Sequence, residues 1–290
     1  MHEITLQGRS KKNSNFRNAV RRFMRNKTAV ISTIIMIVMA LMAIFAPFIT
    51  KYDTETMDLE AVLQGPTAKH WFGTDNYGRD LFSRVVYGGR ISLVVGFVSV
   101  GIGCLFGCTL GAIAGYYGKK ADLIIMRILD VFQAIPSMLM AISISAMLGM
   151  GVINCMLAVG ITGIPKYARI TRAAVMSIKE NEYIEAARAL GEKDAKIILK
   201  HLIPNSLAPI IVQATLGIAT GILSCASLSF IGLGVTPPTP EWGSILSDAK
   251  DYIHGSLHFI MFPGVAIVLA IVTMNLIGDG LRDALDPRLK

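Results

Sequence analysis

The sequence predicts an all-α polytopic membrane protein with about six transmembrane helices. Of its 290 residues, 53% are apolar and only 17% are charged, and the mean hydropathy is positive. Soluble domains carry about a quarter charged residues. Several apolar runs approach or exceed the roughly 20 residues that cross about 30 Å of hydrocarbon. A large soluble helical core would instead show shorter amphipathic segments, so we expect a membrane protein.

The N-terminal segment 1–28 is strongly basic. Its positive charges precede the first apolar run and are opposed only by Glu3; they are Arg9, Lys11, Lys12, Arg17, Arg21, Arg22, Arg25 and Lys27. Such an excess holds a flanking segment on the cytoplasmic side. The formal charge of +8 would also suit nucleic acid. Because the basic residues lie beside apolar runs and not on a separate domain, we expect no nucleic-acid partner.

The first apolar run, 29–49, is long for the core of a signal peptide, and no small-x-small cleavage pattern follows it. It predicts an uncleaved anchor helix with its N-terminus inside. The next stretch, 50–90, is polar, and its acidic residues balance its basic ones. Without a basic surplus it can lie outside, so we predict an external loop.

The remainder, 91–290, is expected to hold five further transmembrane helices. The apolar runs lie at about 91–116, 123–148, 152–164, 206–231 and 259–277. A long polar loop, 179–205, separates the fourth run from the fifth and is rich in lysine and arginine, as is the segment after Pro165. The tail carries Arg282, Arg288 and Lys290. Six crossings with both termini in the cytoplasm satisfy the charge rule at every loop.

Glycine recurs every four residues in the second run, at Gly103, Gly107, Gly111 and Gly115. Residues four apart share a helix face, and glycines there remove the side chains that keep a neighbouring helix away. We predict close helix packing at this face, either within the chain or against a partner.

The third run begins with ionisable residues. Arg127 and Asp130 are three residues apart and can pair on one helix face. Ionisable groups in a membrane helix must pair, reach the interface or face water. Two roles stay open for these residues: they snorkel at the inner interface, or they line a polar pathway or a subunit interface.

No motif predicts catalysis or a cofactor. The chain has no phosphate-binding G-x-x-x-x-G-K-[ST] loop, no H-E-x-x-H and no suitably placed G-x-S-x-G. Cys104 and Cys108 are one turn apart, but no further residue completes a metal set. His254 and His258 are also one turn apart, where a solvated pair is favoured over a metal site. We expect neither catalytic nor metal-binding residues, and any energy source must be another chain.

The polar loop 179–205 reads KENEYIEAARALGEKDAKIILKHLIPN. Asn181 is a candidate N-cap, and acids in the first turn suit the helix dipole. The residues expected near one helix face are Ile184, Ala187, Leu190, Gly191 and Ile198. Small residues at Ala186, Ala187 and Gly191 predict a docking patch, because a partner's cleft can close around them. A helix lying on the membrane surface is the alternative, but it usually carries bulkier apolar residues.

These residues carry a family resemblance. EAARALG, followed after nine residues by HLIP, resembles the E-A-A loop of the membrane subunits of binding-protein-dependent ABC importers, with Ile203 in place of the usual leucine. Three further segments resemble the C-type permease of the dipeptide, oligopeptide, glutathione and nickel importers. They are HWFGTDNYGRDLFSRVVYGGRISL from His70, SLSFIGLGVTPPTPEWG from Ser227 and NLIGDGLRDALDP from Asn275. The resemblance extends over the chain from about Arg21 onward.

The resemblance implies a type I ABC importer permease fold, with 91–290 as the permease core, in a bacterial cell (inner) membrane. It also implies a second homologous permease subunit, two ATP-binding subunits that hold ATP and Mg, and an external solute-binding protein. The residues expected to couple to the ATP-binding subunit are Glu185, Ala186, Ala187, Gly191 and Pro204. Di- or oligopeptides are the favoured cargo, and glutathione, nickel or a metal chelate is the alternative. An intramembrane enzyme is less favoured, because only Arg127 and Asp130 are candidate catalytic groups.

Overall fold

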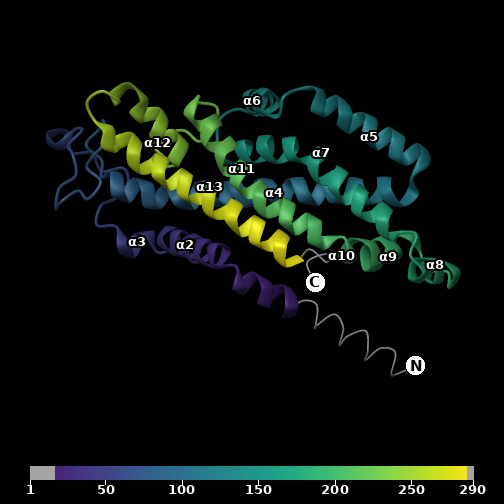
Figure 1. The fold of residues 1–290 in the computed structure, drawn as a ribbon. Helices are drawn as coiled ribbons and strands as arrows, with labels where there is room; N and C mark the ends of the chain where they lie inside the picture. The colour runs from purple at the N-terminus through teal and green to yellow at the C-terminus, as the bar shows by residue number, and fades with distance from the viewer. Residues whose placement is uncertain (1–16, 286–290) are drawn as a thin grey trace.

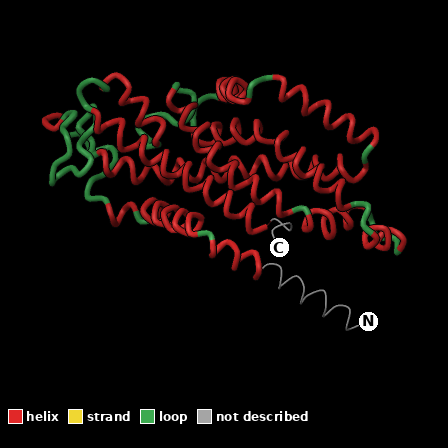
Figure 2. The backbone as a smooth tube through the Cα atoms, in the orientation of Figure 1, coloured by secondary structure: helices red, strands yellow, loops and turns green. Residues whose placement is uncertain are grey.

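The computed structural model describes residues 17–285, almost entirely as helices joined by loops (Figures 1 and 2). Some of the basic residues that were expected on the cytoplasmic side lie outside the described residues, namely Arg9, Lys11, Lys12, Arg288 and Lys290. The long helices are α2 (Lys27–Ile44), α4 (Leu81–Tyr117), α5 (Lys119–Ala134), α6 (Ser137–Leu148), α7 (Val152–Ile178), α11 (Leu207–Phe230) and α13 (Leu257–Leu285). The short helices are α3 (Ala46–Ile49), α8 (Glu182–Ala189), α9 (Asp194–Ile197), α10 (Ile203–Asn205) and α12 (Trp242–Ala249).

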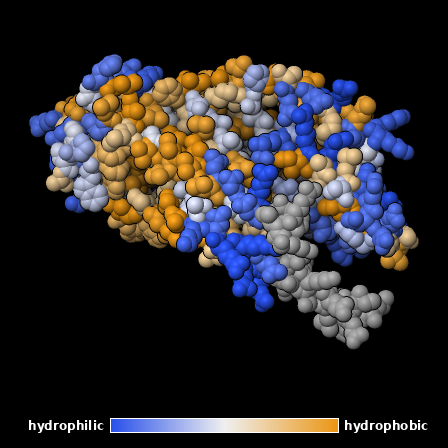
Figure 3. All heavy atoms as spheres, viewed as in Figure 1, coloured by the Kyte–Doolittle hydropathy of each residue, from blue (hydrophilic) through white to orange (hydrophobic). Residues whose placement is uncertain are grey.

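The composition of the helices fits a membrane protein. Among the described residues, α2, α4, α11 and α13 are each long and apolar enough to cross a membrane, and α5 with α6 makes a fifth such segment. The remaining predicted crossing, the fourth, corresponds to α7, which has 27 residues but carries three basic side chains. Figure 3 shows apolar side chains over the middle of the visible face and hydrophilic ones gathered toward both ends of the bundle.

Two polar regions lie at opposite ends of this bundle (Figure 1). We call the end with residues 50–80 and α12 the loop end, and the other the α8 end. The predicted loop 50–90 is too long, because α4 begins at Leu81. The Asp80 carboxylate accepts a hydrogen bond of 2.8 Å from the Ser83 amide and caps α4. Asp80 at the start of α4 and Arg84 in its first turn are both buried within the protein, so these charges do not signal a solvated loop.

The third predicted run is broken, and the fourth is longer than expected. α5 and α6 meet at 88° around Pro136, because a proline pushes the residue before it, Ile135, out of the helical region. In Figure 1, α6 is accordingly seen end-on beside α5. The apolar run 152–164 covers only the first half of a helix, since α7 continues through the buried Pro165 to Ile178. The basic segment after Pro165 is therefore part of a long helix.

The predicted glycine face lies against α7 of the same chain, in the most extensive helix–helix contact of the described chain. A Cβ atom on Gly107 would lie 2.6 Å from the Ile164 carbonyl oxygen, and one on Gly115 would lie 2.9 Å from the Arg172 carbonyl oxygen. Gly103 faces the Tyr167 ring, and a Cβ on Gly111 would collide with the backbone of Ala168. Larger residues would force the two helices apart.

Candidate functional site

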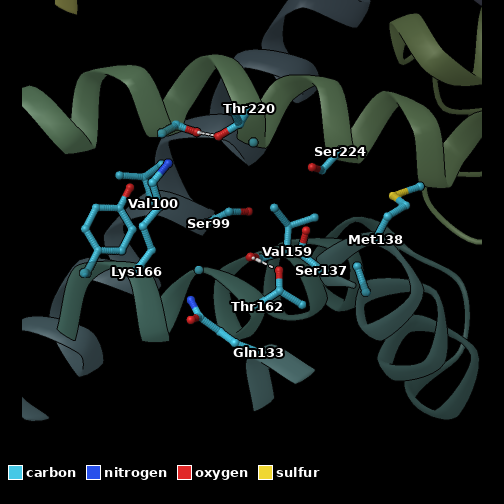
Figure 4. A pocket seen from close by; sticks show the side chains of 15 residues that line it. Ser99, Val100, Gln133, Ser137, Met138, Val159, Thr162, Lys166, Thr220 and Ser224 are labelled. Carbon is cyan, nitrogen blue, oxygen red and sulfur yellow. Dashed lines mark hydrogen bonds between the residues drawn. The ribbon is translucent and has the colours of Figure 1, made fainter. Parts of the chain in front are cut away.

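A polar cavity of about 340 Å³ lies between α4, α5, α6, α7 and α11 (Figure 4). Its polar lining consists of hydroxyl, amide and ammonium groups from Ser99, Gln133, Ser137, Thr162, Lys166, Tyr167, Thr220 and Ser224. Such groups are costly when they face hydrocarbon, so at membrane depth they mark a water-filled or ligand-binding space.

Some of these polar groups are already bound within the chain. The Thr162 hydroxyl donates to the Val159 carbonyl at 2.8 Å, and the Thr220 hydroxyl donates to the Gly217 carbonyl at 2.9 Å. Others have no hydrogen-bond partner within residues 17–285, namely Gln133, Ser137, Ser224 and Lys166. The cavity therefore offers one cation and several neutral hydrogen-bonding groups to a ligand or to water.

Tyr167 forms one wall of the cavity and holds three helices together. Its ring lies against Gly103 of α4, and its hydroxyl lies beside Gly217 of α11. Burial of the Tyr167 side chain is nearly complete. Because Gly103 and Gly217 have no side chains to block the Tyr167 side chain, α7 approaches α4 and α11 closely. Lys166, the preceding residue, faces the cavity.

A wide groove of about 610 Å³ lies between α5 and α7. Arg169 pairs with Asp130 at 2.6 Å, and the Arg172 guanidinium contacts Asp122 through both of its oxygens, one of them at 2.6 Å from Nη2. The predicted pairing of Arg127 with Asp130 is wrong, because α7 brings Arg169 to that carboxylate. Arg127 lines the groove without an acidic partner in the described chain.

The loop 179–205 is anchored to the ends of α4 and α7. Its fully buried residues Ile184, Ile197 and Leu202 pack in one cluster with Tyr116 and Val175. The Tyr116 hydroxyl also donates to Asp194 at 2.7 Å. These contacts hold the loop as a compact unit against the ends of α4 and α7.

The α8 helix begins at the predicted N-cap Asn181, although the Asn181 side chain makes no capping hydrogen bond. The helix ends in a Schellman motif, in which Gly191 has a φ of +77° and the Glu192 amide donates to the Ala187 carbonyl at 3.1 Å. Gly191 thus has a conformational role, because its backbone lies in the left-handed region that favours glycine.

The exposed face of α8 differs from the predicted one. Ala187 is turned inward with Ile184, so Ala186, Ala187 and Gly191 do not form one surface patch. The face directed away from the bundle carries Tyr183, Ala186 and Leu190, and Leu190 is 85% exposed. Which face of α8 turns inward depends on its contacts with Tyr116 of α4 and Val175 of α7. Helical periodicity alone does not decide this.

Glu185 and Pro204, also predicted to couple, lie apart from that face. Glu185 is exposed on the first turns of α8, and Pro204 lies in α10, after a wide π-helical turn over 198–202. Near that turn, Glu192 lies 2.6 Å from Lys196 and 2.9 Å from His201. Both hydrogen bonds lower the pKa of the Glu192 carboxyl below its usual range, and the one from Lys196 contributes more than the one from His201.

Comparison with known proteins identifies the family. The profile of "Binding-protein-dependent transport system inner membrane component" matches residues 107–290, and that of "N-terminal TM domain of oligopeptide transport permease C" matches residues 14–66. The chain belongs to this permease family. It is 49% identical over 277 residues to a dipeptide transport system permease protein DppC of Alkalihalophilus pseudofirmus, covering 96% of this chain and 91% of the relative.

Other relatives of the permease carry related names. A glutathione transport system permease protein GsiD of Pectobacterium atrosepticum is 44% identical, covering 93% of this chain and 90% of the relative. A di/tripeptide transport system permease protein DppC of Pseudomonas aeruginosa is 43% identical, covering 92% and 90%. A structure of the inward-facing MetNI methionine ABC transporter superposes with a TM-score of 0.59 at 21% identity, over 71% of this chain and 98% of that chain. The fold is that of an ABC importer permease.

The loop end of the permease holds a second set of charges. Asp75 is fully buried and lies 2.6 Å from Arg79 and 3.4 Å from Arg84, and Arg79 also lies 3.5 Å from Asp248. Burial raises the pKa of the Asp248 carboxyl, and the neighbouring Arg84 and Arg79 oppose that rise. His70 lies 2.8 Å from Asp80, the cap of α4. The motif that begins at His70 therefore builds a folded, charge-balanced cap.

The polar lining of the cavity was not found by sequence reasoning. Lys166 was counted with the basic segment after Pro165, whose lysines and arginines predicted a cytoplasmic location. One signal was available: Thr162 and Lys166, like Thr220 and Ser224, are spaced four residues apart and so share a helix face. That spacing marks a polar stripe on α7 and another on α11.

Proposed function

We propose that this chain is one of two permease subunits of an ATP-driven importer of di- or oligopeptides. The observation that carries the proposal is the α8 loop, which is anchored to α4 and α7 and presents Tyr183, Ala186 and Leu190 outward. An exposed apolar face on a rigidly held helix suits a docking partner. The peptide cargo is supported by the names of the relatives with 49% and 43% identity. Glutathione is the alternative, supported by the relative with 44% identity.

In this proposal, two ATP-binding subunits lie at the α8 end and hold ATP and Mg, and α8 docks in a cleft of one of them. Closure of these subunits pulls on α8, and the cluster of Ile184, Ile197 and Leu202 carries the movement to α4 and α7. Because both helices line the cavity, the cavity opens alternately to the two sides of the membrane. The chain itself then needs no catalytic residue and no cofactor.

The same arrangement sets the orientation in the membrane. The basic α8 end and both termini lie in the cytoplasm, and the loop end lies outside, where an external solute-binding protein delivers cargo. A second, homologous permease completes the pathway beside the cavity. Ser137, Ser224 and Gln133 have hydrogen-bonding capacity to spare for a peptide backbone, which supports a peptide as the molecule that passes.

The docking face is tested by replacing Leu190 with aspartate in the complex reconstituted with its ATP-binding subunits and binding protein. Docking removes Leu190 from water, which contributes about 1.5–3 kcal/mol, and a buried unpaired carboxylate costs more. We expect Leu190→Asp to lower peptide-stimulated ATP hydrolysis at least about tenfold. The chain should still insert and bind its partner permease.

Leu199→Asp is the matched control, because Leu199 is also an exposed leucine of the same loop, at 66%, and lies outside α8. We expect this variant to keep most of the stimulated hydrolysis. Equal losses in both variants, or normal hydrolysis with Leu190→Asp, would show that α8 is not the docking element. Absence of any peptide stimulation in the unmodified complex would instead reject the peptide cargo.

A further inference from the structure

Lys166 is a charge without an acidic partner in the described chain, and it lies near the middle of α7. It lies about 20 Å from either end of α7 at 1.5 Å per residue. No acidic side chain pairs with Lys166 within the described chain, and no carboxylate is among the residues that line its cavity. In the proposed importer α7 crosses the membrane, and a charged group in the middle of a membrane helix is costly and indicates a functional site.

The neighbouring cations of α7 behave differently. Arg169 and Arg172 lie one and two turns further along the helix, and each is paired with a carboxylate of α5. Those contacts tie α7 to α5 and need no ligand. Lys166 occupies the one cationic position of α7 that lines the cavity. Figure 4 shows it beside Val100, on the side of the cavity away from Ser137 and Ser224.

The groups around Lys166 match the chemistry of one end of a peptide. A carboxylate accepts hydrogen bonds and neutralises an ammonium group. The cavity also offers the Ser137 and Ser224 hydroxyls and the Gln133 amide, which have no partner within residues 17–285 and can bind a peptide group. The ammonium group of Lys166 would repel the cationic end of a peptide, and no carboxylate lines the cavity to attract that end.

We propose that Lys166 binds the C-terminal carboxylate of the peptide during its passage through the membrane. This inference rests on the proposed function and adds the orientation of the cargo: the carboxylate faces α7, and the amino group faces water or the second permease. A single cation in an open, hydrated cavity binds weakly enough to release the peptide again. Lys166 is thus a specificity-determining residue for cargo that carries a carboxylate.

The test compares uptake of a dipeptide with uptake of its C-terminal amide by the complete importer in proteoliposomes. For each cargo, uptake by a variant is expressed relative to the unmodified importer, so the selectivity of the binding protein cancels. We expect Lys166→Gln to lower uptake of the free acid about tenfold, because one charged hydrogen bond is lost. The relative uptake of the amide should stay within about twofold of that of the unmodified importer. Lys166→Arg should retain most of the uptake of the acid.

Arg169→Gln is the matched control, since it removes a cation one turn away that is already paired. It should affect the acid and the amide equally and only slightly. Equal loss of both cargoes in Lys166→Gln would overturn the inference and indicate that Lys166 pairs with a carboxylate of the second permease. Normal uptake of the acid would overturn it too. Failure of the unmodified importer to take up either peptide would reject the proposed function and the inference together.

A chemical rescue covers the case in which Lys166→Gln does not assemble. In a variant with its four native cysteines replaced by alanine, Lys166→Cys is modified after assembly with aminoethyl methanethiosulfonate, which restores an ammonium group at nearly the length of lysine. We expect this treatment, but not the neutral methyl methanethiosulfonate, to restore uptake of the acid. Equal uptake after the two reagents would contradict a role for the charge.

Discussion

The loop end and the groove between α5 and α7 use charged residues in opposite ways. At the loop end, Asp75 and Arg84 are 0% and 1% exposed, and the cations are matched by buried carboxylates. In the groove, the side chains of Arg169 and Asp130 are 47% and 46% exposed, and Arg127 lacks an acidic partner within the described chain. Lys166, which lines the polar cavity, lacks an acidic partner there as well. Charges that build the fold are neutralised inside the chain, because a buried unpaired charge is too costly. Charges left open are available to a ligand or a partner.

The helix contacts also divide into closely packed regions and open ones. α4 meets α7 through glycines, with backbone against backbone, whereas α5 and α6 are bent at Pro136 and leave the cavity beside them. These close contacts hold α4 and α7 together along much of their length. The bent segment leaves the space through which a solute can pass.

The largest expected effect is at the loop end. Asp75→Asn keeps the shape of the side chain but removes the countercharge of Arg79 and Arg84, so it should destabilise the protein by about 3–5 kcal/mol. Thermal unfolding of the purified chain in detergent measures this loss. Asp58→Asn is the control, because its pair with Lys69 is exposed, at 41% and 63%, and contributes about 0–1 kcal/mol. Similar melting temperatures for the two variants would remove the contrast between buried and open charges.

A smaller loss is expected at the glycine contact. Gly111→Leu would place a side chain against the backbone of Ala168, and we expect a destabilisation of about 1–3 kcal/mol or more as α4 and α7 separate. Gly101→Leu on the same helix is the control, since a Cβ atom there meets open space. The two variants are compared by the temperature at which each purified protein loses its monodisperse peak in size-exclusion chromatography. A tolerated Gly111→Leu would mean that close approach of these helices is not required.

The smallest effect is expected in the groove. Arg169→Gln breaks a half-exposed pair with Asp130, so the loss of stability should be about 0–1 kcal/mol. Thermal unfolding in detergent, as for Asp75→Asn, measures this loss. The difference between the two variants tests whether buried charges contribute more to stability than open ones. A loss as large as that of Asp75→Asn would place the groove among the structural charges and weaken the contrast on which the role of Lys166 depends.

Several features were predicted from local sequence because they depend on neighbouring residues. The apolar runs located α2, α11 and α13, the glycine spacing located the close-packed face of α4, and EAARALG located α8. The errors concern contacts between distant segments. Arg127 was paired with Asp130 on one helix, but α7 brings Arg169 to that carboxylate across 39 positions of sequence.

By itself, the sequence determined the class of the protein, because length and apolarity suffice to make a helix favour the membrane, and a run of motif residues identifies the family. Only the tertiary structure decided that α7 continues through Pro165 and that Ala187 faces inward while Leu190 faces out. It also decided that Lys166 lines a cavity in which residues 17–285 supply no countercharge. Each of these depends on which helices become neighbours. A side chain's partner is set by packing between segments far apart in the chain, and the periodicity of one helix carries no information about it.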